Sequence, residues 1–365
     1  MIEVDRAQVL AFRLAALGLT ERGDARPADL PVLDLGVQEY TPGSTHVALA
    51  ARTSAELDDD RLVTVWAARG APHLHRRSDL AALTAQLWPV SDADAAARIK
   101  SGQIPDGMRR GIAALRVTAE AFRAVVRAPM PRGEASTEVS KRVPAELTYD
   151  CAACKARHIA GNVWQQAGLP GGVQVLSRGR EATLGPLDPP VPDLPAGNRG
   201  IGELIATYLR FLGPAGPAEV AKYLLSTTAE IRARWPAELV EVRVDGRKAW
   251  LPADRVPALE SAATPRGVRL LPAMDPLLQS RDRDLLVPDR ARQKEVWRVL
   301  GNPGVVLLDA EIAGVWRPRM AGRKRVDLTV AGFAPFTAAQ RELIETEAMV
   351  VARARAVPAA TVAFE

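Results

Sequence analysis

Two cysteines and a histidine stand close together near the middle of the chain. Cys151 and Cys154 are separated by two residues, and His158 follows four residues later. This spacing can supply half of a tetrahedral zinc site or a redox pair. No second ligand pair of matching spacing is present, and the region lacks the strand-helix-strand order of a thioredoxin. We therefore predict no metal site, and expect both cysteines to pack at the start of a helix that Gly168 closes.

Several other polar side chains admit two interpretations each. His73 and His75 share one face of a predicted strand, so they can line a cleft, bind a metal or belong to a half-exposed sheet. Asp275, Asp282 and Asp284 can serve as acid/base groups, or as a turn and a ladder of salt bridges. The chain contains no Ser/His/Asp order, phosphate-binding glycine loop or dinucleotide motif. Motifs alone therefore indicate no common catalytic class.

Basic side chains gather at predicted hairpin turns that contain glycine. They are Arg178 and Arg180 around Gly179, Arg247 and Lys248 after Gly246, and Arg317, Arg319, Arg323, Lys324 and Arg325 around Gly322. Clustered guanidinium groups suit phosphate oxygens, which they bind through paired hydrogen bonds and with release of counterions. The alternative is that these turns are solvated loops, since exposed turns commonly carry glycine and charge.

The distribution of charge favours a polyanionic partner. The chain has a formal net charge of +5 and a pI near 9.4, which a high arginine content can produce without any function. Residues 266–325, however, hold 13 Lys and Arg against 7 Asp and Glu. This segment exceeds the net charge of the whole chain, so the basic excess is local.

Helices followed by hairpins recur along the chain, which is the order of a winged helix. A strong turn signal, Asp245-Gly246, marks one hairpin, and the proline-rich residues 185–200 predict a domain boundary. After residue 266 the pattern changes to strands, and a last helix is expected over 337–355. We predict an α+β fold of tandem winged helices followed by a small antiparallel β-sheet or barrel and a C-terminal helix. The expected domains are 1–105, 106–190, 200–257 and 266–365, of which the first three are winged helices.

Length and composition predict an intracellular globular protein. The 365 residues suffice for several domains, and 47% hydrophobic with 25% charged residues is a globular balance. No run approaches the ~18 apolar residues of a membrane span, and the acidic N-terminus differs from a secretion signal. With only two cysteines, the chain is expected to be cytoplasmic. No coiled-coil seam is present, so we expect a monomer. We also expect that the protein needs no cofactor.

Several separated segments, in order, resemble the winged-helix crosslink-repair DNA glycosylases (AlkZ/YcaQ-like). These segments are DLGVQEYTPGSTHVALAAR, VWAARGAPHLHRRSDL, the helices and hairpin of 201–252, LLPAMDPLL with SRDR, and GNPGVVLLDAEIAGVWRPR. The resemblance covers nearly the full chain. It implies tandem winged helices and a small β-barrel with a basic concave face that holds double-stranded DNA. It also implies excision of bulky N-alkylated purines, and in some members the unhooking of interstrand crosslinks.

The resemblance points to Gln38 as the first residue of the family's catalytic motif, Gln-apolar-Gln or Gln-apolar-Asp. Here Glu39 replaces the apolar residue, and Tyr40 replaces the second Gln or Asp. A cationic alkylated purine leaves readily, so such an enzyme must orient a water and stabilise an oxocarbenium-like sugar. Gln38 can orient water through its amide carbonyl, whereas Tyr40 offers only a hydroxyl. Glu39 can supply a carboxylate only if the loop is rotated.

Two functions follow from this departure. The first is a monofunctional DNA glycosylase in which water attacks C1′; the second is a non-catalytic DNA-binding protein, such as a regulator or a factor that shields lesions. In both, the basic hairpins bind DNA. The expected DNA contacts are completed by Arg69, His73 and Arg157.

Overall fold

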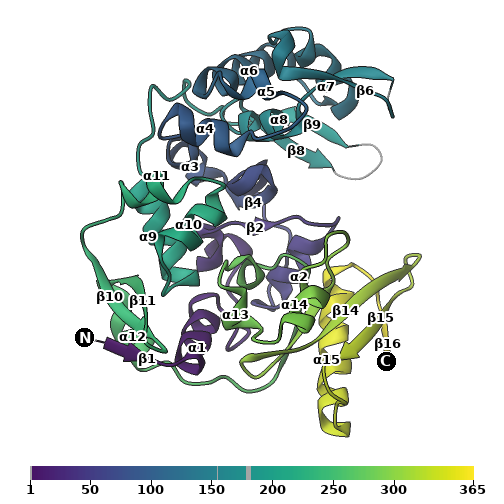
Figure 1. The fold of residues 1–365 in the computed structure, drawn as a ribbon. Helices are drawn as coiled ribbons and strands as arrows, with labels where there is room; N and C mark the ends of the chain where they lie inside the picture. Colours follow the sequence, from purple (N-terminus) through teal and green to yellow (C-terminus); the bar gives the residue numbers. More distant parts are fainter. Residues whose placement is uncertain (1, 154, 178–181) are drawn as a thin grey trace. The chain divides into compact units, whose positions relative to one another are not determined.

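The computed structural model describes residues 2–153, 155–177 and 182–365 (Figure 1). It has a mixed α+β fold, as the sequence predicts. Its contacts divide the chain into two compact units, and the boundary passes through helix α9 (Ile201–Leu212). Unit 1 comprises residues 1–59, 206–216 and 237–365, and unit 2 comprises residues 60–205 and 217–236.

Helix α1 (Arg6–Ala16) opens unit 1. Its start is fixed by a capping box, in which the Asp5 carboxylate accepts the Gln8 N–H at 2.8 Å and Gln8 Oε1 accepts the Asp5 N–H at 3.2 Å. Spacing of three and four residues places one apolar stripe against the core. The buried members of the stripe are Val9, Leu10, Phe12 and Leu14.

A three-stranded sheet packs against α1 in the order β1-β10-β11. The hairpin of β10 (Leu239–Val244) and β11 (Arg247–Pro252) is the one predicted from its turn. Asp245 and Gly246 have φ of 46° and 75°, which is the conformation that a two-residue hairpin turn requires. The sequence pattern did not predict β1 (Ile2–Val4), which pairs parallel to β10.

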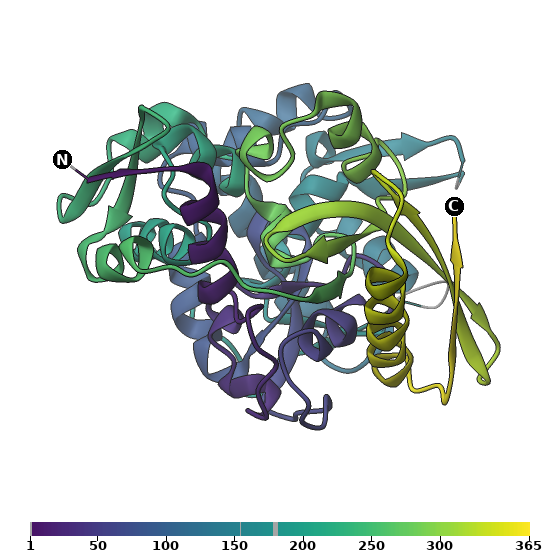
Figure 2. The same cartoon turned by 90° about the horizontal axis from the view of Figure 1, so that it is seen from below.

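A five-stranded sheet carries the C-terminal part of unit 1, in the order β12-β13-β14-β15-β16. Its first four strands are antiparallel, as expected: β12 (Val268–Leu271), β13 (Gly304–Leu308), β14 (Glu311–Ala321) and β15 (Arg325–Gly332). Helix α15 (Ala338–Ala354) confirms the predicted last helix and packs on the sheet (Figure 2). It leads into β16 (Ala360–Phe364), an unpredicted strand that pairs parallel to β15. Among the described strands no pairing joins β12 to β16, so of the two predicted alternatives, a sheet or a barrel, the structure has the open sheet.

Short elements complete unit 1. They are β2 (Val37–Gln38), α2 (Ser44–Ala50), α12 (Val256–Glu260), α13 (Arg283–Leu286), α14 (Arg290–Val296) and four 3₁₀ turns at Pro27–Asp29, Pro31–Asp34, Ala253–Arg255 and Pro276–Gln279.

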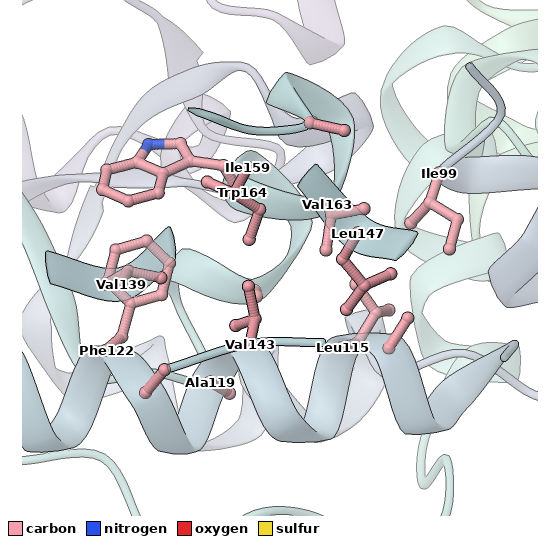
Figure 3. Close-up of a cluster of buried hydrophobic side chains, with 14 of the residues drawn as sticks. Ile99, Leu115, Ala119, Phe122, Val139, Val143, Leu147, Ile159, Val163 and Trp164 are labelled. Carbon is pink, nitrogen blue, oxygen red and sulfur yellow. The ribbon is translucent and has the colours of Figure 1, made fainter. Parts of the chain in front are cut away.

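Unit 2 is built around a core of aromatic and branched side chains (Figure 3). Its centre is Phe122, whose ring lies 4.4 Å from that of Trp164 and 6.4 Å from that of Trp66. Such tilted pairs add to the stabilisation gained from area burial alone. The helices of the unit, besides the first turn of α9, are α3 (Leu80–Leu87), α4 (Asp92–Arg98), α5 (Pro105–Met108), α6 (Ile112–Val125), α7 (Arg132–Ser140), α8 (Gly161–Gly168), α10 (Pro217–Leu224) and α11 (Thr228–Arg232).

The strands of unit 2 form hairpins. Strands β3 (Leu62–Trp66) and β4 (Pro72–Arg76) form one, and β4 is the strand predicted to carry His73 and His75. The predicted hairpin is that of β8 (Val173–Ser177) with β9 (Thr183–Pro186), to which β5 (Met130–Pro131) adds a third strand. Short 3₁₀ turns occur at Ala68–Gly70, Arg77–Asp79 and Ala145–Leu147.

The prediction of a helix that begins at Cys151 is wrong. Strands β6 (Thr148–Cys151) and β7 (Ala156–Ile159) form a hairpin there, and the helix begins only at Gly161. Lys155 has a φ of 52°, which a right-handed helix cannot contain. Cys151 therefore ends a strand and is partly exposed, whereas Cys154 lies outside the described residues.

None of the described helices is long and apolar enough to cross a membrane. In the same part of the chain, no three His, Cys, Asp or Glu side chains are grouped so that they could hold a metal ion.

Candidate active site

Gln38 is the last residue of strand β2, and the loop that follows it leads to helix α2 in unit 1. Gly36 and Gly43 flank the strand and this loop with φ of 78° and 79°, a left-handed backbone that glycine adopts without strain. The Gln38 side chain is largely buried, with 9% of the residue exposed. The loop is therefore a defined turn that presents a small part of Gln38 to solvent.

Glu39 stabilises the start of α2. Its carboxylate accepts hydrogen bonds from the backbone N–H groups of Gly43 at 2.7 Å and Thr45 at 2.9 Å, and from the Ser44 hydroxyl at 3.3 Å. A negative charge at a helix N-terminus also interacts favourably with the helix dipole. Both oxygens of Glu39 thus serve the helix, and Glu39 does not line the adjacent cavity.

Tyr40 forms part of the wall of a cavity of about 400 Å³ in unit 1. Its hydroxyl oxygen accepts a hydrogen bond from the backbone N–H of Asn302 at 3.1 Å, and its own N–H donates to the Ser44 hydroxyl at 2.9 Å. The ring is therefore fixed at both ends. The cavity is lined by the loop at 40–42 and by residues 272–273, 301–304, 316–318, 320 and 355.

Two arginines bring positive charge to this cavity. Arg317 on β14 donates to the Gly301 carbonyl at 3.0 Å, and Arg355, which follows α15, donates to the Pro42 carbonyl. Burial lowers the pKa of the Arg355 guanidinium, and the charge of Glu39 opposes that shift. One guanidinium thus holds each of the two loops that border the cavity.

Trp316 provides a rigid part of the cavity wall. It is 2% exposed and its indole N–H donates to the Leu271 carbonyl at 2.9 Å. Gly304 faces the ring so closely that an added Cβ would collide with it and would lie 2.6 Å from the same carbonyl. Only glycine at 304 therefore allows β13 to approach this indole.

The aspartates considered as acid/base groups are held in ion pairs or hydrogen bonds. Asp275 is fully buried, and its two oxygens accept from Arg52 at 2.8 and 3.0 Å. Asp282 accepts from both terminal nitrogens of Arg13, at 2.6 and 3.0 Å. Asp284 accepts from Gln293 at 2.7 Å and is exposed. These groups support the fold of unit 1, in agreement with the turn and salt-bridge interpretation for Asp275 and Asp282.

A sequence model of the AlkZ-like DNA glycosylases matches residues 32–354, which is most of the chain. The chain belongs to this family. Among solved structures, the Streptomyces sahachiroi DNA glycosylase AlkZ is similar, with a TM-score of 0.76 and 22% sequence identity over 100% of both chains. At that identity the likeness shows a shared fold. No curated protein matches.

The basic residues predicted on unit 1 of this AlkZ-like chain lie on two hairpins. Arg247 and Lys248 begin β11 and are exposed, although Lys248 pairs with Glu241 at 3.2 Å. The other group surrounds the turn of β14 and β15 at Gly322, where φ is 64°. Its members are Arg317, Arg319, Arg323, Lys324 and Arg325, all exposed. The hairpin places Arg317 and Arg319 on the same face of β14.

The residues predicted on unit 2 differ in their availability. Arg157 is exposed and donates to the Thr148 hydroxyl at 2.7 Å. Arg69 stacks on the ring of Tyr223 at 4.9 Å. His73 is 0% exposed, and its Nδ1 lies 2.8 Å from the Ala71 carbonyl, so it cannot reach a phosphate in this conformation. The predicted Arg178 and Arg180 lie outside the described residues.

Sequence reasoning missed two residues of the candidate site, Asn302 and Arg355. The Gly301-Asn302-Pro303 turn was visible as a turn signal, but nothing in it indicates a hydrogen bond to Tyr40. Arg355 is one of many arginines in the chain, and no local pattern distinguishes it.

Proposed function

We propose that this AlkZ-like protein is a monofunctional DNA glycosylase that excises N-alkylated purines by attack of water at C1′. The observation that carries the proposal is the position of Tyr40, two residues after Gln38; Gln38 itself is not among the residues that line the cavity. Tyr40 and Arg317 from the basic hairpin line the same cavity. One group that can act on a nucleotide and one that can hold its phosphate are thus within one site.

Gln38 and Tyr40 divide the chemistry between them. The amide carbonyl of Gln38 is the candidate for orienting water, because it can accept the water's hydrogen bond. The Tyr40 oxygen accepts from the Asn302 N–H, and this leaves its hydroxyl hydrogen to donate to a water or a sugar oxygen. The alkylated base is already cationic, so no acid is needed to protonate it, and the carboxylate of Glu39 can remain with helix α2.

The DNA contacts are the second part of the proposal. We assign phosphate contacts to Arg247 and Lys248, to the basic residues of the β14–β15 hairpin, and to Arg157, because these side chains are exposed. Helices α6, α7 and α8 with the sheet β5-β9-β8 have the order of a winged helix, which supports the predicted domain at 106–190.

Release of 7-methylguanine from a duplex tests the proposal. Unmodified protein should release the base, and Gln38→Ala should reduce the rate by about 10²–10³-fold, as loss of a group that stabilises a transition state does. Tyr40→Phe should reduce it less, because the ring and its place in the wall are retained. Release that is unchanged in Gln38→Ala would assign the chemistry to another residue.

A non-catalytic DNA-binding protein is the second candidate. The observation that favours it is that neither Glu39, which caps α2, nor Tyr40 supplies the second amide or carboxylate of the family's motif. Binding to alkylated duplexes with no base release from any of several of them would select this function.

A further inference from the structure

The loop between α14 and β13 presents two bare apolar side chains. Val299 is 100% exposed and Leu300 is 85% exposed. Single exposed apolar residues are common, but two adjacent ones at the tip of a loop leave a continuous apolar edge in water. Both belong to unit 1 and directly precede Gly301, which lines the cavity beside Tyr40.

The base of this loop is fixed at both ends. On the side of α14, the Trp297 indole N–H donates to the Leu278 carbonyl at 3.2 Å, and the Arg283 guanidinium lies over its ring at 4.9 Å. On the side of β13, the Asn302 N–H donates to the Tyr40 hydroxyl and the Gly301 carbonyl accepts from Arg317. The apolar tip is therefore held in place by its ends, and its exposure is built into the fold.

The charges around the tip are positive. Arg298 precedes it and is exposed, and Arg317 holds the residue that follows it. An apolar edge with a guanidinium on each side matches a nucleic acid duplex, in which phosphates flank the stacked bases. Proteins that kink DNA insert such apolar side chains between base steps.

We propose that Val299 and Leu300 form a wedge that enters the base stack of duplex DNA next to the alkylated nucleotide. The proposal rests on the proposed function, because it takes DNA as the partner. Insertion would unstack the neighbouring base step. Because Asn302 of the same loop donates to the Tyr40 hydroxyl, the inserted side chains and Tyr40 would both lie beside the opened nucleotide. The wedge is a positioning device, since neither side chain has chemistry to contribute.

A fluorescent duplex tests the wedge. The duplex carries 2-aminopurine beside a 7-methylguanine whose sugar is fluorinated at C2′ to prevent base loss. Saturating unmodified protein should raise the 2-aminopurine fluorescence, because the probe brightens when it is unstacked. Val299→Ser combined with Leu300→Gln should abolish the rise and weaken affinity about tenfold or more, as expected for one lost buried aliphatic side chain.

Matched variants separate apolar insertion from other effects. Leu300→Met keeps an apolar side chain of similar volume and should keep the signal. Leu343→Ser removes a side chain that is 46% exposed on α15 and should change nothing. None of these variants alters charge, so the salt dependence of binding should stay constant.

Three results would overturn the wedge. They are a full fluorescence rise in the double variant, no rise with saturating unmodified protein, and loss of self-association in the double variant with unchanged DNA binding, which would make a second copy the partner. Base release from unmodified 7-methylguanine is measured separately. A normal rise in 2-aminopurine fluorescence without base release would support the wedge and refute the glycosylase activity. Base release without a rise in fluorescence would support the activity and refute the wedge.

Discussion

The adjacent residues Glu39 and Tyr40 form hydrogen bonds with different parts of unit 1. The Glu39 carboxylate accepts from the first turn of α2, whereas the Tyr40 hydroxyl accepts from Asn302 across the cavity. The sequence alone placed Gln38, Glu39 and Tyr40 among the catalytic candidates, because it contains no information on which backbone amides a carboxylate will meet. The structure supplies that information for Glu39.

Replacing Glu39 by glutamine tests its role as a helix cap. Glu39→Gln keeps the shape but loses the charge at the start of α2, so unfolding should require about 1 kcal/mol less. Base release should remain close to that of the unmodified protein. Thermal unfolding and release assays together check this outcome. Loss of release by more than tenfold at unchanged stability would instead make Glu39 a catalytic residue.

The buried Arg52–Asp275 pair makes a second prediction at this scale. Both side chains are almost completely buried, and removal of one leaves the other charge unpaired. Arg52→Met should therefore lower the free energy of unfolding by about 3–5 kcal/mol. Glu311→Gln breaks the exposed pair with Arg6 and should cost only about 0–1 kcal/mol. Urea denaturation measures both, and equal losses would contradict the reasoning.

At the scale of elements, the sequence predicted those helices and hairpins whose turn or capping residues lie within a few positions of them. The hairpin at Asp245-Gly246 was predicted because turn residues act within a few positions. The hairpin at Cys151 was missed, because nothing in the letters reveals the positive φ of Lys155. The cavity could not be predicted at all, since Tyr40 and Asn302 are 262 residues apart in sequence.

The hairpin of β14 and β15 contains a carboxylate, that of Asp327, which should make the stability of the protein depend on pH. The pKa of Asp327 on β15 is lowered, first by a hydrogen bond from Arg325, then by one from Thr361, and by the charges of Arg325 and Arg319. A lowered folded-state pKa stabilises the fold above the unfolded value, near 3.9, and this stabilisation is lost as the pH falls through the folded value. Asp327→Asn should remove it.

Urea denaturation at several pH values measures the effect of Asp327→Asn. The unmodified protein should be the more stable of the two near neutral pH, and the difference should shrink below about pH 4. A difference that stays constant over the whole range would mean that the carboxylate of Asp327 does not contribute through its charge.

At the scale of the whole molecule, charge determines how DNA would be bound. The exposed arginines of the β14–β15 hairpin should release counterions from phosphates, so affinity should fall steeply with salt. Arg317→Gln and Arg319→Gln together should reduce the slope of log affinity against log salt by about 0.9 for each lost phosphate contact. Fluorescence anisotropy with a labelled duplex measures this slope.

Arg266→Gln is the matched control for that experiment. Arg266 is exposed in the same unit, but it precedes β12, whose first residue pairs with the end of β13 farthest from the Gly322 turn. Its loss should leave the slope unchanged. A decrease in Arg266→Gln of about half that in the double variant, which removes two charges instead of one, would show that total charge, and not the hairpin, controls binding.

The cavity beside Tyr40 can be completed only late in the synthesis of the chain. Its walls come from both early and late parts of the chain, Tyr40 and Arg355 among them. A ribosome adds about 5–20 residues per second, so the interval between these two is on the order of tens of seconds. During that interval the nascent polypeptide lacks part of the wall of this cavity. Translation that stops before codon 355 would thus yield a product without Arg355 and without its hydrogen bond to the Pro42 carbonyl.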